Sequence, residues 1–304
     1  MDYQALLERI HSELEPRFGE GRVARYIPEL ANVSPEHFGM ALVTTSGERY
    51  RVGDADVKFS IQSISKVFSL AIAMQLDGEA IWARCGREPS GNPFNSLVQL
   101  EVEAGIPRNP FINAGALVVT DAILSRLSDA RGAVLDFIRR VSGDADIGFN
   151  EAVAASEAAT GHRNAAMAHF LKSFGNLHNP AAAVLDAYFH HCAIEMSCVQ
   201  VAEACLFLAA RGRSPHVEEP VMSASETKYL NALMLTCGTY DAVGEFAFRV
   251  GLPAKSGVGG GIVATLPGHY SVCVWSPGLD AQGNSTLGSC ALDLLTSESG
   301  VSIF

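Results

Sequence analysis

Apolar residues recur at helical spacing at the start of the chain and through its middle third. Asp2 can cap a first helix, whose apolar positions return every three or four residues until Pro16 stops it. The Gly, Pro and Asn content of Cys85–Ser96 predicts a loop. From Gly115 to about Arg211 the helical period runs almost throughout, which predicts an all-helical block. Shorter helical patterns follow at 223–236, 244–250 and 285–296.

Strand-like patterns lie near both ends of the chain. Residues 39–52 place β-branched and aromatic side chains on either side of the turn pair Ser46-Gly47, which predicts a β-hairpin. Residues 254–266 and 269–277 have the composition of two further strands, joined at Pro267-Gly268. Each end of the chain therefore contributes one predicted hairpin.

This order of elements predicts an α+β fold with a discontinuous sheet. The two hairpins form one antiparallel sheet, covered by the first and last helices, and the helical block is inserted between them. Residues 1–70 and 225–304 would make a mixed sheet-and-helix subdomain, and residues 71–224 a helical subdomain. We expect the active-site cleft where the two subdomains meet.

Composition excludes several classes of function. The 304 residues are 48% hydrophobic, which is ample for a core, and 33 acidic against 22 basic side chains give a net charge of −11. Nucleic acids and acidic membranes are therefore not expected as partners. Seven cysteines without a C-x-x-C pair predict free, mostly buried thiols and no metal site. Since no signal sequence and no apolar run of about 18 residues is found, we expect a cytoplasmic protein.

The segment Phe59–Leu70 carries the first candidate chemistry. It turns from a β-branched and aromatic run into a helical pattern and places Ser63 and Lys66 three residues apart, so that both share a helix face. Lys66 is the only charged residue between Lys58 and Asp77. A lysine in such apolar surroundings loses affinity for its proton, which suits Lys66 to act as the base for a Ser63 nucleophile.

A second motif, Lys255-Ser256-Gly257, follows about 190 residues later. It can lay a backbone edge and a cation along a cleft, and the glycines after it allow close approach to a ligand. S-x-x-K followed by K-S-G matches, in order and spacing, the motifs of the serine β-lactamases and penicillin-binding peptidases. Their middle S-D-N motif is absent from this chain, which argues against a β-lactam target.

Several further segments resemble the bacterial and mitochondrial glutaminases, in the right order from about residue 20 to residue 290. The segments are YIPEL at Tyr26, FSIQSISK at Ser63, PRNPFINAGAL around Asn113, SEAATGHRN from Glu157 to Asn164, AYF at Tyr188, CGTYD at Tyr240 and LPAKSGVGGG at Val258. The resemblance implies a β-lactamase-like fold and hydrolysis of L-glutamine to L-glutamate and ammonia without a cofactor. It makes Ser63 and Lys66 the catalytic pair. The residues that would contact glutamine are Tyr26, Asn113, Glu157, Asn164, Tyr188, Tyr240 and Val258.

The chemistry of these residues agrees with glutamine as a substrate. Glu157 could pair with the α-ammonium group, whereas Asn113, Asn164 and the tyrosine hydroxyls can donate to the α-carboxylate. Each residue also has an ordinary structural interpretation, such as a turn former for Asn113 or a solvated helix acid for Glu157. The histidines at 162, 190 and 191 lack ligand partners at metal spacing and are expected to be structural.

We therefore predict acyl transfer in two steps. Lys66 would remove the Ser63 proton, Ser63 would form a glutamyl ester, and the backbone N–H groups of Ser63 and Val258 would hold the oxyanion. Tyr240 is the candidate for relaying a proton to ammonia, with Tyr26 supporting the hydroxyl network.

Three alternatives to a glutaminase stay open at this point. They are a penicillin-binding or β-lactamase-like hydrolase, an esterase of the same fold, and a non-enzymatic helical binding module. The family resemblance also suggests a homodimer or homotetramer.

Overall fold

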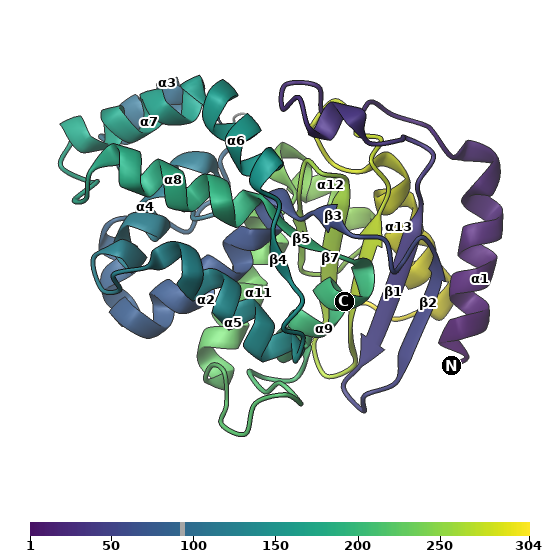
Figure 1. Ribbon diagram of the computed structural model, residues 1–304. Coiled ribbons are helices and arrows are strands. Elements are labelled where there is room, and N and C mark those ends of the chain that lie inside the picture. Colours follow the sequence, from purple (N-terminus) through teal and green to yellow (C-terminus); the bar gives the residue numbers. More distant parts are fainter. Residues whose placement is uncertain (92–94) are drawn as a thin grey trace.

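The computed structural model describes residues 1–91 and 95–304, and its centre is a five-stranded antiparallel sheet (Figure 1). The strand order is β2-β1-β8-β7-β6, so strands from the two ends of the chain pair in the middle, with Gly39 opposite Trp275. This confirms the predicted sheet made of an N-terminal and a C-terminal part. The strands are β1 (Gly39–Thr44), β2 (Arg49–Gly53), β6 (Ala254–Ser256), β7 (Gly261–Leu266) and β8 (Tyr270–Trp275).

One prediction for this sheet is wrong, because residues 254–266 form two strands rather than one. β6 and β7 pair with each other through a turn at 257–260. A Cβ atom on Gly257 would lie 2.5 Å from the Ile61 carbonyl oxygen, and one on Gly259 would lie 2.2 Å from that of Ser60. Glycine is therefore required where the turn packs on the backbone just before Ser63.

Helices cover both faces of the sheet. The terminal helices α1 (Tyr3–Leu14) and α13 (Thr286–Ser299) lie together against one face, as predicted, and share an apolar cluster with the strands. Asp2 caps α1 by accepting the Ala5 N–H at 3.1 Å. β1, β7 and β8 are buried along their whole length, whereas β2 alternates between exposed and half-buried positions, as an edge strand does.

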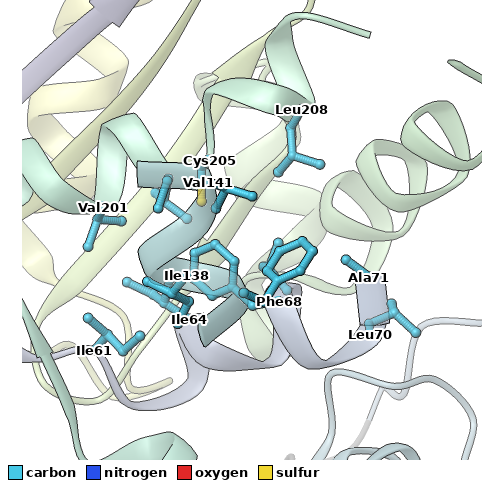
Figure 2. Packing of buried hydrophobic residues seen from close by; sticks show 14 of the residues in the cluster. Ile61, Ile64, Phe68, Leu70, Ala71, Ile138, Val141, Val201, Cys205 and Leu208 are labelled. Atoms are coloured by element: carbon cyan, nitrogen blue, oxygen red, sulfur yellow. The ribbon is translucent and has the colours of Figure 1, made fainter. Parts of the chain in front are cut away.

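The rest of the molecule is mainly helical, and α2 lies in its interior. Figure 2 shows apolar side chains of the Ser63 segment and α2, such as Ile64 and Phe68, facing residues of α5 such as Ile138. The helices are α2 (Ser65–Asp77), α3 (Leu97–Val102), α4 (Asn113–Leu124), α5 (Ala130–Ser142), α6 (Glu151–Thr160), α7 (His162–Ser173), α8 (Ala181–Cys192), α9 (Cys198–Ala204), α10 (Leu206–Ala209), α11 (Ala224–Cys237) and α12 (Val243–Arg249).

The sequence predicted that the middle third is entirely helical, and this prediction is wrong. A small antiparallel sheet joins β3 (Phe59–Ser60), β5 (Ile194–Met196) and β4 (Gly148–Phe149), in the order β3-β5-β4. These strands have two or three residues, too few for an alternating pattern to be visible in the sequence. The predicted loop at Cys85–Ser96 is free of helix and strand where it is described, and its residues 92–94 lie outside the described chain. Within the described residues, no helix has both the length and the apolar character needed to cross a bilayer.

The buried Asp121 on α4 ties the helical part together. Its carboxylate accepts the backbone N–H groups of His178 and Asn179 at 3.0 and 2.7 Å and also binds the Arg84 guanidinium. Burial raises the pKa of Asp121, but these hydrogen bonds outweigh it and hold the pKa below its ordinary value. Asp121 therefore joins α4 both to the segment between α7 and α8 and to Arg84.

Replacing Asp121 by alanine is expected to lower the free energy of unfolding by about 3–5 kcal/mol, because Arg84 loses its buried partner. Urea unfolding measures this loss. Asp136→Ala is the matched control, since the Asp136 side chain is 77% exposed. A change of at most about 0.5 kcal/mol is expected there. Equal losses in the two variants would contradict the anchoring role of Asp121.

Candidate active site

Seven of the predicted site residues line one cavity of about 260 Å³. This volume suits a small metabolite rather than a drug-sized ligand. The seven are Tyr26, Ser63, Asn113, Glu157, Asn164, Tyr188 and Val258. They come from the loop before β1, the turn before α2, the starts of α4 and α7, α6, α8 and the glycine turn. The fold thus gathers residues that lie up to 232 positions apart in the sequence.

Ser63 lies in a short 3₁₀ turn, Gln62–Ile64, that runs directly into α2. Its side chain is buried, and its hydroxyl is hydrogen-bonded to the Tyr240 hydroxyl. Gln62 has a φ of +50°, in the left-handed region that a residue with a side chain seldom adopts. This turn directs Ser63 into the cavity, while Ile64 packs into the core.

Lys66 lies one turn further on and is almost completely buried. Its Nζ donates to the Phe111 carbonyl at 3.1 Å and to Asn113 Oδ1 at 2.7 Å. In the described part of the chain, both hydrogen bonds found for this nitrogen thus go to the loop before α4 and the first residue of α4 rather than to Ser63. Burial lowers the pKa of Lys66 to about 8, although the nearby Cys192 and Glu157 counteract this. A neutral amine has two N–H groups and one lone pair, so these two acceptors leave the lone pair for a proton.

Lys255 is a second buried amine beside the first. It is fully buried, donates to the Ser256 carbonyl at 2.5 Å, and has its Nζ 4.8 Å from the centre of the Tyr240 ring. Burial, together with the charge of Lys66, lowers the pKa of Lys255 well below its ordinary value. The sequence analysis identified Lys255 as the cation of the K-S-G motif but did not predict it to be a site residue.

Tyr240 connects the serine to the glycine turn. Its hydroxyl donates to the Ser256 carbonyl at 3.3 Å and is also hydrogen-bonded to Ser63 and to the backbone N–H of Val258. Burial raises the pKa of Tyr240, and the latter two bonds only partly offset this, so the phenol stays protonated. Its φ of +58° is a second strained backbone position beside Ser63.

The polar end of the cavity contains one acid and two amides. Burial raises the pKa of Glu157 to about 7, against a hydrogen bond from Gln62 and the charge of Lys66, which lower it. Asn113 Nδ2 donates to Asn164 Oδ1 at 3.0 Å. Because Asn164 accepts with its oxygen, its amide N–H groups suit a carboxylate ligand. Asn113 therefore links Lys66 to Asn164 through hydrogen bonds. The sequence had predicted only a contact with the substrate for Asn113.

The two remaining tyrosines differ in exposure. Tyr188 is buried, and the centre of its ring lies 5.8 Å from Lys66 Nζ. Its hydroxyl is hydrogen-bonded to the Cys192 thiol. Tyr26 lines the cavity from its rim and is 59% exposed as a whole, but burial of its hydroxyl, with the nearby Tyr240 and Glu157, raises the pKa of Tyr26 well above its ordinary value. Tyr188 thus forms an inner wall, whereas Tyr26 lies where a ligand enters.

The family model for glutaminase matches residues 21–304. The chain belongs to the glutaminase family. Curated glutaminases from Ralstonia nicotianae and Paraburkholderia phytofirmans are 61% and 58% identical to it, and each comparison covers the whole of both chains. A probable glutaminase from Bacillus subtilis, solved in complex with 6-diazo-5-oxo-L-norleucine, is similar with a TM-score of 0.90 and 32% identity, covering 100% of this chain and 98% of that one.

Membership of the glutaminase family confirms the two main predictions from the sequence. The fold is β-lactamase-like, and the activity is that of an amidohydrolase acting on L-glutamine. Among the alternatives, the family match favours glutamine over a β-lactam or an ester.

Sequence reasoning missed Gln62 and Cys192, which also line the glutaminase cavity. Gln62 adjoins Ser63, so its position could have been noticed, but Cys192 carries no motif of its own. His190 and His191 are hydrogen-bonded to the backbone carbonyls of Asp186 and Ala130, consistent with the structural role expected for them. Within the described residues, no group of three or more metal-ligating side chains is found.

Replacing Glu157 by glutamine is expected to stabilise the empty protein above neutral pH and to weaken glutamine binding. The folded pKa of about 7 lies above the ordinary 4.5, so ionisation of Glu157 costs stability as the pH rises through this window. The variant avoids this cost, which amounts to about 2–3 kcal/mol at pH 8.

Urea unfolding at pH 5 and pH 8 measures the effect of Glu157→Gln, with Glu151→Gln on the same helix as the control because the Glu151 side chain is 66% exposed. The gain should shrink to about 1 kcal/mol at pH 5, because the folded wild type holds the Glu157 proton there and the unfolded wild type has lost only part of it. A gain that is the same at both pH values would show that Glu157 is not the titrating group.

Proposed function

We propose that this glutaminase hydrolyses L-glutamine through a covalent ester on Ser63. Ser63 Oγ bonds to the side-chain carbonyl carbon of glutamine, and its proton passes to the Lys66 amine. The C–N bond then breaks, and the nitrogen leaves as ammonia after receiving a proton through Tyr240. Water attacks the ester, the C–O bond to Ser63 breaks, and glutamate leaves as the serine recovers its proton.

The observation that carries this proposal is the state of Lys66. Its amine is buried one turn from Ser63 and bonded to two acceptors, Phe111 O and Asn113 Oδ1. With a pKa of about 8, a substantial fraction of this amine is neutral near pH 8, with a lone pair for the Ser63 proton. The Ser63 hydroxyl is hydrogen-bonded to Tyr240, and we propose that it turns toward Lys66 before the proton is transferred.

We propose that the remaining cavity residues hold the amino acid. Glu157 would pair with the α-ammonium group, whereas Asn113, Asn164, Tyr188 and the rim residue Tyr26 would surround the rest of glutamine. The N–H groups of Ser63 and Val258 would hold the oxyanion, each worth roughly 10²–10³ in rate.

We also propose that this cavity lies between two subdomains, 1–70 with 225–304 and 71–224. In support, Ser63 and Val258 come from the first set and Glu157 and Asn164 from the second.

We propose further that the enzyme is a cytoplasmic homodimer or homotetramer. Seven free cysteines, six of them buried, fit a reducing compartment. Val98, Val102 and Phe248 are 72%, 76% and 88% exposed, which supports association of this chain with copies of itself.

Ammonia release from L-glutamine should fall to a small residual rate in Ser63→Ala and in Lys66→Ala, while both variants keep the wild-type fold by circular dichroism. Ser69→Ala on the same helix is the control, and its activity should stay within about twofold of wild type. As a second readout, 6-diazo-5-oxo-L-norleucine should label wild type by forming an O–CH₂ bond at Ser63 with loss of N₂. Wild-type turnover by either active-site variant would remove that residue from the mechanism.

Tyr240→Phe should lower kcat about 10²-fold or more if Tyr240 relays the proton to ammonia. Tyr26→Phe should act mainly on KM, because Tyr26 lies at the exposed rim. Steady-state kinetics of the two variants separate these roles. The reverse pattern would assign the relay to Tyr26.

A further inference from the structure

The loop before α4 and the first residue of α4 provide the two acceptors of the Lys66 amine. Phe111 offers its carbonyl oxygen, and Asn113 offers its side-chain oxygen from the first position of α4. The direction of the amine therefore depends on the path of this short stretch of backbone.

Asn109 fixes that path from inside the protein. Its side chain is 1% exposed, and its Oδ1 accepts the N–H groups of Phe111 at 3.0 Å and Ile112 at 3.1 Å. On its other side, Nδ2 donates to the Glu88 carbonyl at 2.9 Å. An Asn that accepts from the N–H groups two and three residues ahead closes a local turn. All three bonds end on backbone groups, so Asn109 determines where the main chain runs.

The surrounding backbone leaves this turn little freedom. The Gly86 N–H donates to the Pro107 carbonyl at 2.7 Å, which holds the incoming chain. On the outgoing side, a Cβ atom on Gly115 would lie 2.0 Å from the Asn109 carbonyl oxygen. The turn therefore packs directly on the first turn of α4, and a change at Asn109 is passed to Phe111 and Asn113.

We propose that Asn109 is a positioning residue that aims the lone pair of Lys66 at Ser63. A neutral amine has two N–H groups, and fixing the acceptor of each fixes the direction of its lone pair. Asn109 holds the Phe111 carbonyl and the start of α4 that carries Asn113, and so sets both acceptors. This inference rests on the proposed role of Lys66 as the base.

Asn109→Ala is expected to lower kcat for glutamine by about 10- to 100-fold, since a misplacement of about 1 Å in a reacting group can cost 10²-fold. KM should change less than kcat does, because Asn109 itself does not line the cavity and Asn113 is only one of the residues proposed to contact glutamine. Asn109→Ser keeps a short acceptor for the turn and should recover part of kcat. The matched control is Asn231→Ala, which removes another buried asparagine with two hydrogen bonds, to Leu208 and Thr265. If kcat fell as much in Asn231→Ala as in Asn109→Ala, the role of Asn109 would be purely structural.

A double-mutant cycle with Lys66→Ala tests whether Asn109 acts through Lys66. We expect Asn109→Ala to have no further effect on the residual rate once Lys66 is gone. Independent, multiplicative losses would overturn the positioning role while leaving Lys66 as the base. Wild-type turnover by Lys66→Ala alone would instead overturn the proposed base and, with it, the inference about Asn109. An unchanged kcat in Asn109→Ala would refute the inference directly.

Discussion

The active site depends on keeping two primary amines out of water. Lys66 and Lys255 are 2% and 0% exposed, and a buried ammonium group without a counter-ion is costly enough to favour loss of its proton. The acid that shares the cavity, Glu157, is shifted in the opposite direction for the same reason. The low polarity of one region thus moves the pKa values of an amine and of a carboxyl group toward neutral pH. The apolar packing around α2, shown in Figure 2, is consequently part of the chemistry as well as of the core.

Two of the four non-glycine residues with positive φ in the described chain lie beside Ser63. Gln62 and Tyr240 both have positive φ, at a cost of roughly 1–2 kcal/mol each for residues with side chains. Gln62 is held by a hydrogen bond to Ser60 at 3.0 Å, and the Tyr240 hydroxyl is held by the strand that carries Lys255. The surrounding core maintains two conformations that neither residue would prefer alone, and both serve to direct side chains at Ser63.

The long elements could be predicted from the sequence because their signal is local. The first helix has a cap, a regular apolar period and a proline stop, and the hairpin at 39–52 has a clear turn pair. Local patterns failed where a contact with a distant segment decided the structure. The division of 254–266 into two strands follows from the approach of its glycines to the backbone at Ser60 and Ile61, which no local pattern records. The three short strands of the second sheet exist only because they pair with one another.

The same distinction applies to the site. The residues predicted to bind glutamine were identified because their motifs resemble those of a family, and the structure brings six of them, together with Ser63, to one cavity. The sequence also predicted a desolvated Lys66, since its neighbours along the helix are apolar. It could not show that the Lys66 amine faces the loop before α4, because that contact joins residues 45 and 47 positions apart. The K-S-G motif that contains Lys255 could be recognised in the sequence. The burial of Lys255 beside Lys66 could not, because it likewise depends on tertiary packing.

The glycine turn between β6 and β7 has a consequence for the range of acyl groups that the enzyme could be made to accept. One wall of the cavity is built from backbone in contact with backbone, where Gly257 and Gly259 lie against residues 60 and 61. Behind Val258 and Ser63, which line the cavity, a side-chain atom added at Gly257 or Gly259 would push the turn that carries Ser63 away from the sheet. The rim at the exposed Tyr26, by contrast, consists of side chains that can be exchanged. Attempts to widen the substrate range by redesign should therefore begin at that rim and leave the glycine wall unchanged.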